Sequence, residues 1–300
     1  MTYGVIDIGS NTIRLCIYDV RDGSITSLFN SKNTAGLVDY VNDGELSRRG
    51  IRKACNVLNS YREMAKRAGI QELYVFATAS LRNISNTADA VHEIRSQTGL
   101  AVDVLSGYDE AVLDFEGASY ARNLQNGLLV DIGGGSTELL AFADGKIQEA
   151  VSLEIGSLFL YKNYVGKLFP KTKERKAICS RVDVELKKVM FLKERQYPDM
   201  IGIGGTIRAV KKFNNDLLGL EPGNEIIQAE HLKMMHNVLQ DEERRTLKKI
   251  LRIAPDRVHT LIPGMLILER ICRVCGCQQI QVSGFGVREG YLYRKAVVEK

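Results

Sequence analysis

One short pattern occurs twice in this chain, and the repetition constrains the fold more than any other feature. The first copy runs Val5-Ile6-Asp7-Ile8-Gly9-Ser10-Asn11-Thr12, and the second runs Leu129-Val130-Asp131-Ile132-Gly133-Gly134-Gly135-Ser136-Thr137. Each copy reads as an apolar strand, an aspartate, a turn of small residues and a second strand. A repeat of this kind indicates an internal duplication. The sequence therefore predicts two related lobes, residues 1–124 and residues 125–300.

The two copies align residue by residue. Asp7 corresponds to Asp131 and Arg14 to Glu138, and each meander is closed by an Asp-Gly pair, at residues 22–23 and 144–145. Turns of small residues let backbone N–H groups approach an anionic oxygen closely. An ordinary hairpin seldom needs three consecutive glycines between carboxylates, so the pattern favours phosphate binding. The residues expected to bind phosphate are Gly9, Ser10, Asn11, Thr12, Gly133, Gly134, Gly135, Ser136 and Thr137.

Strands and helices alternate along the rest of the chain, as in α/β folds. Periodicity predicts first-lobe strands at 3–8, 13–19, 24–30, 73–77 and 101–105, and helices at 47–68, through residue 95, and from about 108. It predicts a second-lobe meander at 127–142 and 146–153, then mostly helices, with short strands at 200–203 and 280–282. The last helix could pack back on the first lobe. Each short strand runs into glycines that open a helix, and a helix N-terminus favours anions, so Gly205 and Thr206 are further candidates for phosphate binding.

Charge is shared unevenly between the lobes. Residues 1–124 hold 13 Lys and Arg against 15 Asp and Glu, whereas residues 125–300 hold 28 against 21. A basic lobe suits a polyanion such as a long phosphate chain or a nucleic acid, although solvated helix faces explain the charge equally well. The chain has no apolar run long enough to span a membrane and no basic region followed by an apolar run at its N-terminus. A cytoplasmic protein is the expectation.

Cysteine and histidine give little support for a metal centre. Cys272, Cys275 and Cys277 lie close together, but no further Cys or His stands at zinc-ligand spacing. We interpret them as buried, reduced thiols. A phosphate loop of the Gly-x-x-x-x-Gly-Lys-Ser/Thr type is also absent from the sequence.

Several charged residues around the two turns could carry chemistry. Asp131 and Glu138 flank the three glycines and could hold Mg²⁺, which often binds one or two carboxylates together with substrate phosphate. Arg14, at the position of Glu138, has the planar donor fork that suits phosphate. Arg82 follows a strand in a turn rich in Ser and Thr, where a helix cap is an equal alternative. Glu110 opens a helix, where acids usually serve the helix dipole.

Taken together, these segments resemble the exopolyphosphatase/guanosine pentaphosphate phosphatase (Ppx/GppA) family, in its short form without a helical C-terminal domain. The resemblance rests on Asp7 to Leu15, Ala77 to Arg82, Glu110-Ala111, Asp131 to Glu138, Gly204 to Thr206 and Val287 to Gly290, in that order. It implies the duplicated actin-like ATPase/sugar-kinase (ribonuclease H-like) fold, an α/β fold of two lobes with a central cleft. It also implies hydrolysis of a terminal phosphoanhydride.

By carry-over from the family, Glu110 looks like the general base, and Asp131 and Glu138 look like acids at the metal and water. Asp7 is a further candidate metal ligand, Mg²⁺ or another divalent cation is the implied cofactor, and Arg14 and Arg82 look like phosphate clamps. The expected substrate is inorganic polyphosphate, with short chains as a guess, or else pppGpp. The resemblance is consistent with a homodimer, and neither nucleic acid nor membrane is an expected partner.

Two other classes of function stay open: an ATP-dependent kinase of the same superfold, and a non-catalytic polyphosphate or nucleotide sensor. Arg14 and the Glu110-Ala111 pair favour the phosphatase over a kinase. The carboxylates Glu110, Asp131 and Glu138 favour an enzyme over a sensor, because a pure binder needs no base. His259 stands where relatives often have an acid, and its role is an open question.

Overall fold

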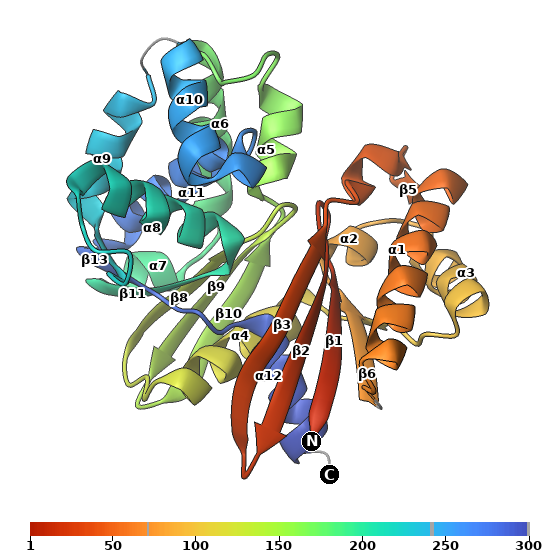
Figure 1. Ribbon diagram of the computed structural model, residues 1–300. Coiled ribbons are helices and arrows are strands. Elements are labelled where there is room, and N and C mark those ends of the chain that lie inside the picture. Colours follow the sequence, from red (N-terminus) through yellow and green to blue (C-terminus); the bar gives the residue numbers. More distant parts are fainter. Residues whose placement is uncertain (71, 241–242, 299–300) are drawn as a thin grey trace. The chain divides into compact units, whose positions relative to one another are not determined.

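The computed structural model of the chain describes residues 1–70, 72–240 and 243–298 (Figure 1). Its contacts divide the chain into two compact units, Met1–Leu113 with Val287–Lys300, and Asp114–Gly286. This division differs from the expected one at residue 124, because it falls within a continuous helix, α4 (Gly107–Ala121). The C-terminal segment belongs to the first unit.

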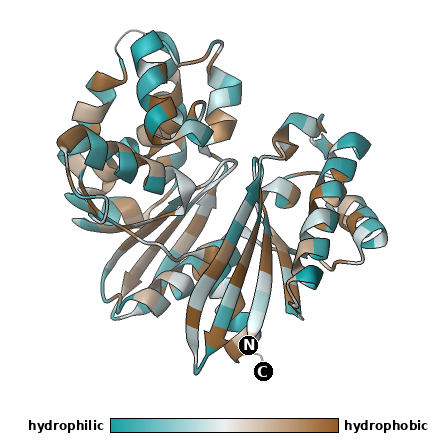
Figure 2. Cartoon of the chain, viewed as in Figure 1, coloured by the Kyte–Doolittle hydropathy of each residue, from teal (hydrophilic) through white to brown (hydrophobic). Residues whose placement is uncertain are grey.

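The first unit contains one five-stranded sheet with the order β3-β2-β1-β6-β7. The first three strands form an antiparallel meander, whereas β6 and β7 run parallel to β1. Its strands are β1 (Thr2–Ile8), β2 (Ile13–Arg21), β3 (Ser24–Asn33), β6 (Glu72–Ala77) and β7 (Asp103–Val104), with a small separate pair, β4 (Val41–Asn42) and β5 (Glu45–Leu46). Its helices are η1 (Leu37–Tyr40), α1 (Arg48–Arg67), α2 (Ala79–Arg82), α3 (Thr87–Thr98), α12 (Val287–Tyr293) and η3 (Arg294–Val298). Helix α1 is amphipathic, with hydrophobic residues interspersed among hydrophilic ones along its length (Figure 2). This is expected of a helix that covers a sheet with one face.

The second unit contains a six-stranded sheet with the order β10-β9-β8-β11-β13-β12. Its strands are β8 (Gly127–Ile132), β9 (Thr137–Ala143), β10 (Lys146–Leu153), β11 (Asp199–Ile203), β12 (Ile226–Gln228) and β13 (Gln279–Val282). Its helices are α5 (Ser157–Tyr164), α6 (Thr172–Leu186), α7 (Phe191–Glu194), α8 (Gly204–Leu218), α9 (Ala229–Val238), α10 (Glu243–Ile253), η2 (Pro255–Arg257) and α11 (Leu261–Cys275).

The two sheets share one topology, as the repeated sequence predicts. In each, an antiparallel meander of three strands is followed by strands parallel to the first, and β12 is an addition at the far edge of the second sheet. The Asp-Gly pairs close both meanders with positive φ at both residues, 50° and 75° at Asp22-Gly23 and 50° and 68° at Asp144-Gly145. Two such residues define the turn whose twist matches that of a hairpin.

Several short strands differ from the expectation, among them the pair β4 and β5, where no strand was expected. The strand expected at residues 101–105 pairs only over Asp103–Val104. Strand β12 was not expected, because it has three residues, of which only the middle one, Ile227, is buried. A strand this short and this exposed leaves no alternating pattern for the sequence to reveal.

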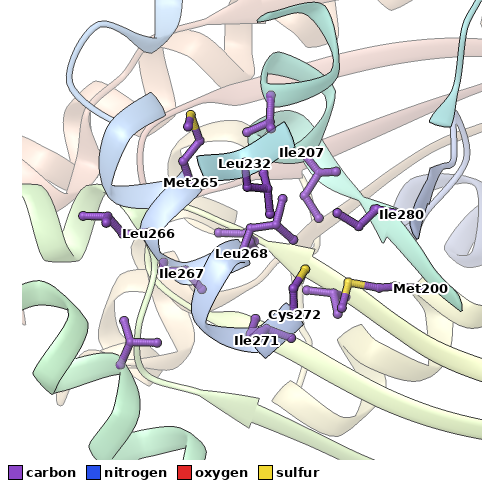
Figure 3. Packing of buried hydrophobic residues seen from close by; sticks show 14 of the residues in the cluster. Met200, Ile207, Leu232, Met265, Leu266, Ile267, Leu268, Ile271, Cys272 and Ile280 are labelled. Atoms are coloured by element: carbon purple, nitrogen blue, oxygen red, sulfur yellow. The ribbon is translucent and has the colours of Figure 1, made fainter. Parts of the chain in front are cut away.

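Helix α11 forms the centre of the hydrophobic core of the second unit (Figure 3). Every residue from Leu261 to Leu268 is buried, and the helix packs against α5, α6, α8 and α9. A helix that is apolar on all sides is typical of such a position. Cys272, Cys275 and Cys277 are buried in the same core. The described residues contain no group of three or more His, Cys, Asp or Glu arranged to hold a metal ion, and no described helix has the length and apolar character to cross a membrane.

Replacing Leu268 with alanine tests this core. Its side chain is fully buried, so Leu268→Ala should lower the free energy of unfolding by about 2–5 kcal/mol. Leu251→Ala is the matched control, because Leu251 lies on α10 and is 48% exposed; it should change that free energy by less than about 0.5 kcal/mol. Urea unfolding followed by circular dichroism measures both. Equal losses in the two variants would contradict the central position of α11.

Candidate functional site

The three consecutive glycines lie in the loop between β8 and β9. Asp131 and Glu138 are paired across these antiparallel strands, and the Gly133 N–H donates to the Ser136 carbonyl at 3.0 Å. Directly opposite residues of an antiparallel pair lie on the same face, with Cβ atoms about 4.5–5.5 Å apart. The two predicted carboxylates therefore stand side by side at the base of the second glycine loop (Gly133–Gly135).

The carbonyl groups of this loop are held by the first turn of α5. The Ser157 N–H donates to the Gly133 oxygen at 2.9 Å, and the N–H groups of Leu158 and Phe159 donate to the Gly134 oxygen at 3.0 and 2.9 Å. The N–H groups of Gly134 and Gly135 donate to no protein acceptor in the described part of the chain. With the carbonyls of Gly133 and Gly134 held by α5, the loop leaves the amides of Gly134 and Gly135 for an anionic oxygen.

Gly156 makes this arrangement possible, and sequence reasoning missed it. A Cβ at Gly156 would collide with the backbone of Gly134 and Gly135. No turn or positive φ requires a glycine here; only the close approach of two backbones does. The signal in the sequence is a lone glycine before a helix, which is too common to be informative.

The two carboxylates of the second unit have defined surroundings. Glu138 is 1% exposed, and its Oε1 accepts a hydrogen bond from the Ser152 hydroxyl at 2.7 Å. Asp131 lies against Gly204, where a Cβ would collide with the carboxylate and where φ is +81°. Mg²⁺ is usually bound by one or two carboxylates together with waters and substrate phosphate oxygens. The residues present therefore fit a divalent cation bound by Asp131 and Glu138 together with a substrate oxygen.

Beside this pair, α8 begins at Gly204-Gly205-Thr206. Gly205 lies under the guanidinium of Arg257, where a Cβ would collide with Nη2. A helix N-terminus combined with a guanidinium group favours an anion. The guanidinium of Arg257 therefore supports the prediction that Gly205 binds phosphate. Thr206 is buried, and its hydroxyl lies 3.5 Å from that of Ser157, a contact within the protein. Arg257 was given no role from the sequence, because it lies about fifty residues after the helix that it faces.

The first glycine-containing loop (Gly9–Thr12) is built in the same way. The Gly9 N–H donates to the Thr12 carbonyl at 3.0 Å, and the carbonyls of Ser10 and Asn11 accept from Val38 and Gly36 at 3.1 and 2.9 Å. The segment that returns after the third strand of the meander thus holds the loop in both units.

A second contact holds the strand end from which the first loop begins. The Ser80 hydroxyl donates to the carbonyl of Ile8, the last residue of β1. The turn that was predicted to bind phosphate through Arg82 therefore also positions this loop, with Ser80 making the contact.

Asp7 and Arg14 are paired across β1 and β2, as Asp131 and Glu138 are across β8 and β9. Burial raises the pKa of the Asp7 carboxyl, while Arg288 and then Arg14 act to lower it. The Arg14 Nη1 donates to Asn30 Oδ1 at 2.8 Å. The charges nearest Asp7 in its unit thus include two guanidinium groups. Metal binding by Asp7 and phosphate binding by Arg14 stay predictions.

Arg82 and Glu110 form an ion pair, with Nη1 2.7 Å from Oε2. Arg82 also donates to the Leu105 carbonyl at 3.2 Å, which ties α2 to the start of α4. Glu110 lies in the first turn of α4 and is 7% exposed. The structure therefore brings these two predicted residues together, and each is a partner of the other.

The structure thus defines a class of protein: two α/β units of one topology, each with a small-residue loop after its first strand, as in the actin-like ATPase fold. Solved structures of similar fold include an exopolyphosphatase from Cytophaga hutchinsonii (TM-score 0.87, 23% identity, 98% of this chain and 97% of that one). The Ppx/GppA family member of Aquifex aeolicus gives a TM-score of 0.81 at 23% identity, over 100% and 99% of the two chains. The protein EutJ of Carboxydothermus hydrogenoformans is more distant, with a TM-score of 0.52 at 14% identity, over 98% and 89%.

The chain belongs to the Ppx/GppA phosphatase family, whose model matches residues 16–299. Exopolyphosphatase 1 of Mycobacterium tuberculosis is 26% identical over 307 residues, which cover 98% of this chain and 88% of the relative. The guanosine-5'-triphosphate,3'-diphosphate pyrophosphatase of Aliivibrio fischeri is 23% identical over 97% of this chain and 58% of its own length. The predicted fold, family and enzyme class are confirmed.

Substituting Gly156 tests the loop geometry. Gly156→Ala should lower kcat/KM at least about tenfold, because the added methyl group must displace the loop backbone and misplacing a binding group by about 1 Å costs on the order of 10²-fold in rate. Gly223→Ala is the control, since nothing lies near its Cβ. Steady-state kinetics with circular dichroism measures both. Unchanged KM and kcat in a folded Gly156→Ala protein would contradict the role of this contact.

Proposed function

We propose that this phosphoanhydride hydrolase acts on inorganic polyphosphate and removes its terminal phosphate, with Mg²⁺ and a water activated by Glu110. The observation that carries the proposal is the second glycine loop, whose carbonyls are held by α5 above the paired carboxylates Asp131 and Glu138. The choice of polyphosphate as substrate is supported by the relatives. The match to exopolyphosphatase 1 covers 88% of that protein, whereas the match to the guanosine-nucleotide pyrophosphatase covers 58% of its length.

Each group has a task that its surroundings suit. The amides of Gly134 and Gly135 bind oxygens of the terminal phosphate, and Arg257 over Gly205 neutralises charge on the phosphate chain. Bound Mg²⁺ would neutralise phosphate charge, with Asp131 and Glu138 as its protein ligands. Ser152 holds the Glu138 carboxylate in one orientation. Phosphoryl transfer asks a protein mainly for such positioning and charge neutralisation.

Glu110 orients the attacking water and takes its proton on a carboxylate oxygen. The Glu110 carboxylate is held by Arg82 through one oxygen, Oε2, and that leaves the carboxylate fixed in direction, as a general base must be. Arg82 then serves as a positioning residue for Glu110, in addition to any contact with phosphate.

The alternative substrate is pppGpp, which offers a comparable terminal phosphoanhydride. Phosphate release from tripolyphosphate, long-chain polyphosphate, pppGpp and ATP, measured in parallel with Mg²⁺, separates the candidates. Release from pppGpp alone would replace polyphosphate as the substrate, and release from ATP alone would favour the ATP-dependent branch of the fold.

Glu110→Gln should lower kcat by about 10²–10⁴-fold, because the amide cannot accept the proton of the attacking water. Binding of polyphosphate should be retained, since the glycine loops are unchanged. Glu63→Gln is the matched control, because this glutamate is 50% exposed on α1. Phosphate release and equilibrium binding check the expectation. Near-normal turnover by Glu110→Gln would remove this residue from the mechanism.

Glu138→Gln and Ser152→Ala test the metal assignment. Glu138→Gln should raise the Mg²⁺ concentration for half-maximal activity at least about tenfold, and Ser152→Ala should raise it less, because outer contacts orient the ligand. In wild type, removal of divalent cations by a chelator should abolish release until Mg²⁺ is restored. Titration of activity with Mg²⁺ measures all three. A lower kcat with an unchanged Mg²⁺ requirement in Glu138→Gln would contradict metal binding by Glu138.

A further inference from the structure

Basic side chains gather at one end of the second unit, where α5 ends, α6 begins and α10 lies. Helices α5, α6 and α10 are neighbours there in Figure 1, and much of α10 is hydrophilic in Figure 2. From the end of α5 into α6, the basic residues are Lys162, Lys167, Lys171, Lys173, Arg175 and Lys176; on α10 they are Arg244, Arg245, Lys248, Lys249 and Arg252. We name these two sets together the basic surface. All of its residues except Arg175 and Lys249 are exposed.

A cavity of about 290 Å³ lies within the basic surface, lined in part by Lys167, Lys171, Arg175, Leu239 and Glu243. Arg175 is fixed at its wall, because its Nε and Nη2 donate to the carbonyls of Pro170 and Leu239 at 2.9 and 2.8 Å. Its Nη1 is buried and has no acceptor among the described residues. The cavity therefore has a rigid guanidinium group at its wall and two lysines beside it.

Helix α5 connects the second glycine loop to the basic surface. Helix α5 begins at Ser157, which holds the Gly133 carbonyl, and its eight residues end at Tyr164, about 12 Å along the axis. The Tyr161 hydroxyl donates to the Lys167 carbonyl at 3.1 Å, and the His259 ring lies 4.8 Å from the Tyr161 ring. Through Tyr161, α5 therefore contacts both His259 and the backbone of Lys167, between the glycine loop and the cavity-lining lysines.

Acidic residues near the cavity do not cancel this charge. The Glu174 carboxylate accepts hydrogen bonds from the backbone N–H groups of Gly166 and Lys171 at 2.9 and 2.7 Å, which lower its pKa. It thus serves as the cap of α6. Glu243 stands at the cavity wall. Asp241 and Glu242 precede it and lie outside the described residues. Arg252 is paired with Asp216 of α8, with Nη2 2.6 Å from Oδ2. The other ten residues of the basic surface still outnumber these acids.

We infer that the basic surface binds the distal part of a long polyphosphate chain whose terminal phosphate occupies the second glycine loop. The inference rests on the proposed function and deepens it, because it assigns a preference for long chains where short ones were the expectation from the sequence. The occupant follows from charge complementarity and from the position of α5, which begins at the glycine loop and ends at the basic surface. Lysine side chains, with their long flexible stems, suit a flexible polyanion, and the cavity admits part of it.

The double variant Lys167→Gln/Lys171→Gln tests the basic surface. KM for long-chain polyphosphate should rise roughly three- to tenfold, with kcat and the KM for tripolyphosphate unchanged, because only a long chain reaches these residues. The slope of log KM against log salt should flatten by about 0.7 for each lost phosphate contact. Glu243→Gln should lower the same KM. The matched control is Lys53→Gln/Lys66→Gln, which removes two exposed charges from α1 and should change none of these values.

A binding arm separates this inference from the proposed function. Long-chain polyphosphate is titrated onto Glu110→Gln with and without the two lysine substitutions, and weaker binding in the combined variant supports the basic surface even if no phosphate is released. Three outcomes would overturn it: an equal rise in KM for tripolyphosphate, no change for either substrate, or a single-stranded RNA that competes with polyphosphate at equal affinity. The last would assign the surface to nucleic acid.

Discussion

The backbone of the glycine loops is positioned by amides from a returning segment of chain, and the rest of the site depends on that contact. In the second unit, the first turn of α5 supplies the donors; in the first unit, Gly36 and Val38 do. Because the carbonyls of Ser10 and Asn11 in one loop and of Gly133 and Gly134 in the other accept these bonds, the backbone of each loop is fixed, and the Gly134 and Gly135 amides are left for an oxygen from outside. A glycine is needed at residue 156 because the two backbones touch there. The loop is thus shaped by packing, and its composition alone would leave it free to move.

The duplication preserves this backbone arrangement while changing the charges placed on it. Opposite Asp7 stands Arg14, whereas opposite Asp131 stands Glu138. The first pair is of opposite sign and resembles the many cross-strand pairs that stabilise sheets. The second pair is of like sign and suits a divalent cation. One fold unit has therefore been used twice with different electrostatics, which explains why Asp131 and Glu138, and not the first pair, are the stronger candidates for the metal.

The parts of this structure that the sequence predicts are those set by local physics. Alternating apolar residues predict the meanders, and the Asp-Gly pairs predict turns whose positive φ values are observed. The contacts divide the two units inside α4, where helical periodicity is continuous and the sequence carries no sign of a boundary. β12 was missed because it exists only through its pairing with β13.

Some residues of the candidate site could be predicted from the sequence and others could not. The loop residues, Asp131 and Glu138 could be predicted because they belong to the repeated segment. Arg257 and Gly156 could not, because their roles come from contacts between segments far apart in sequence or from the approach of two backbones. The Arg82–Glu110 ion pair is intermediate: both residues were singled out, yet nothing in the sequence shows that they bind one another.

The positive charge of the second unit contributes to binding only in combination with the second glycine loop. An exposed lysine contributes little to binding on its own, about 0.2–1 kcal/mol for a typical surface ion pair. When the terminal phosphate is already held, however, each further contact with the same chain becomes intramolecular and benefits from a high effective concentration. Weak contacts along α5, α6 and α10 can then add up for a long chain and contribute nothing for a short one. A net positive lobe, which by itself is equally explained by solvated helix faces, thereby becomes a means of selecting substrates by length.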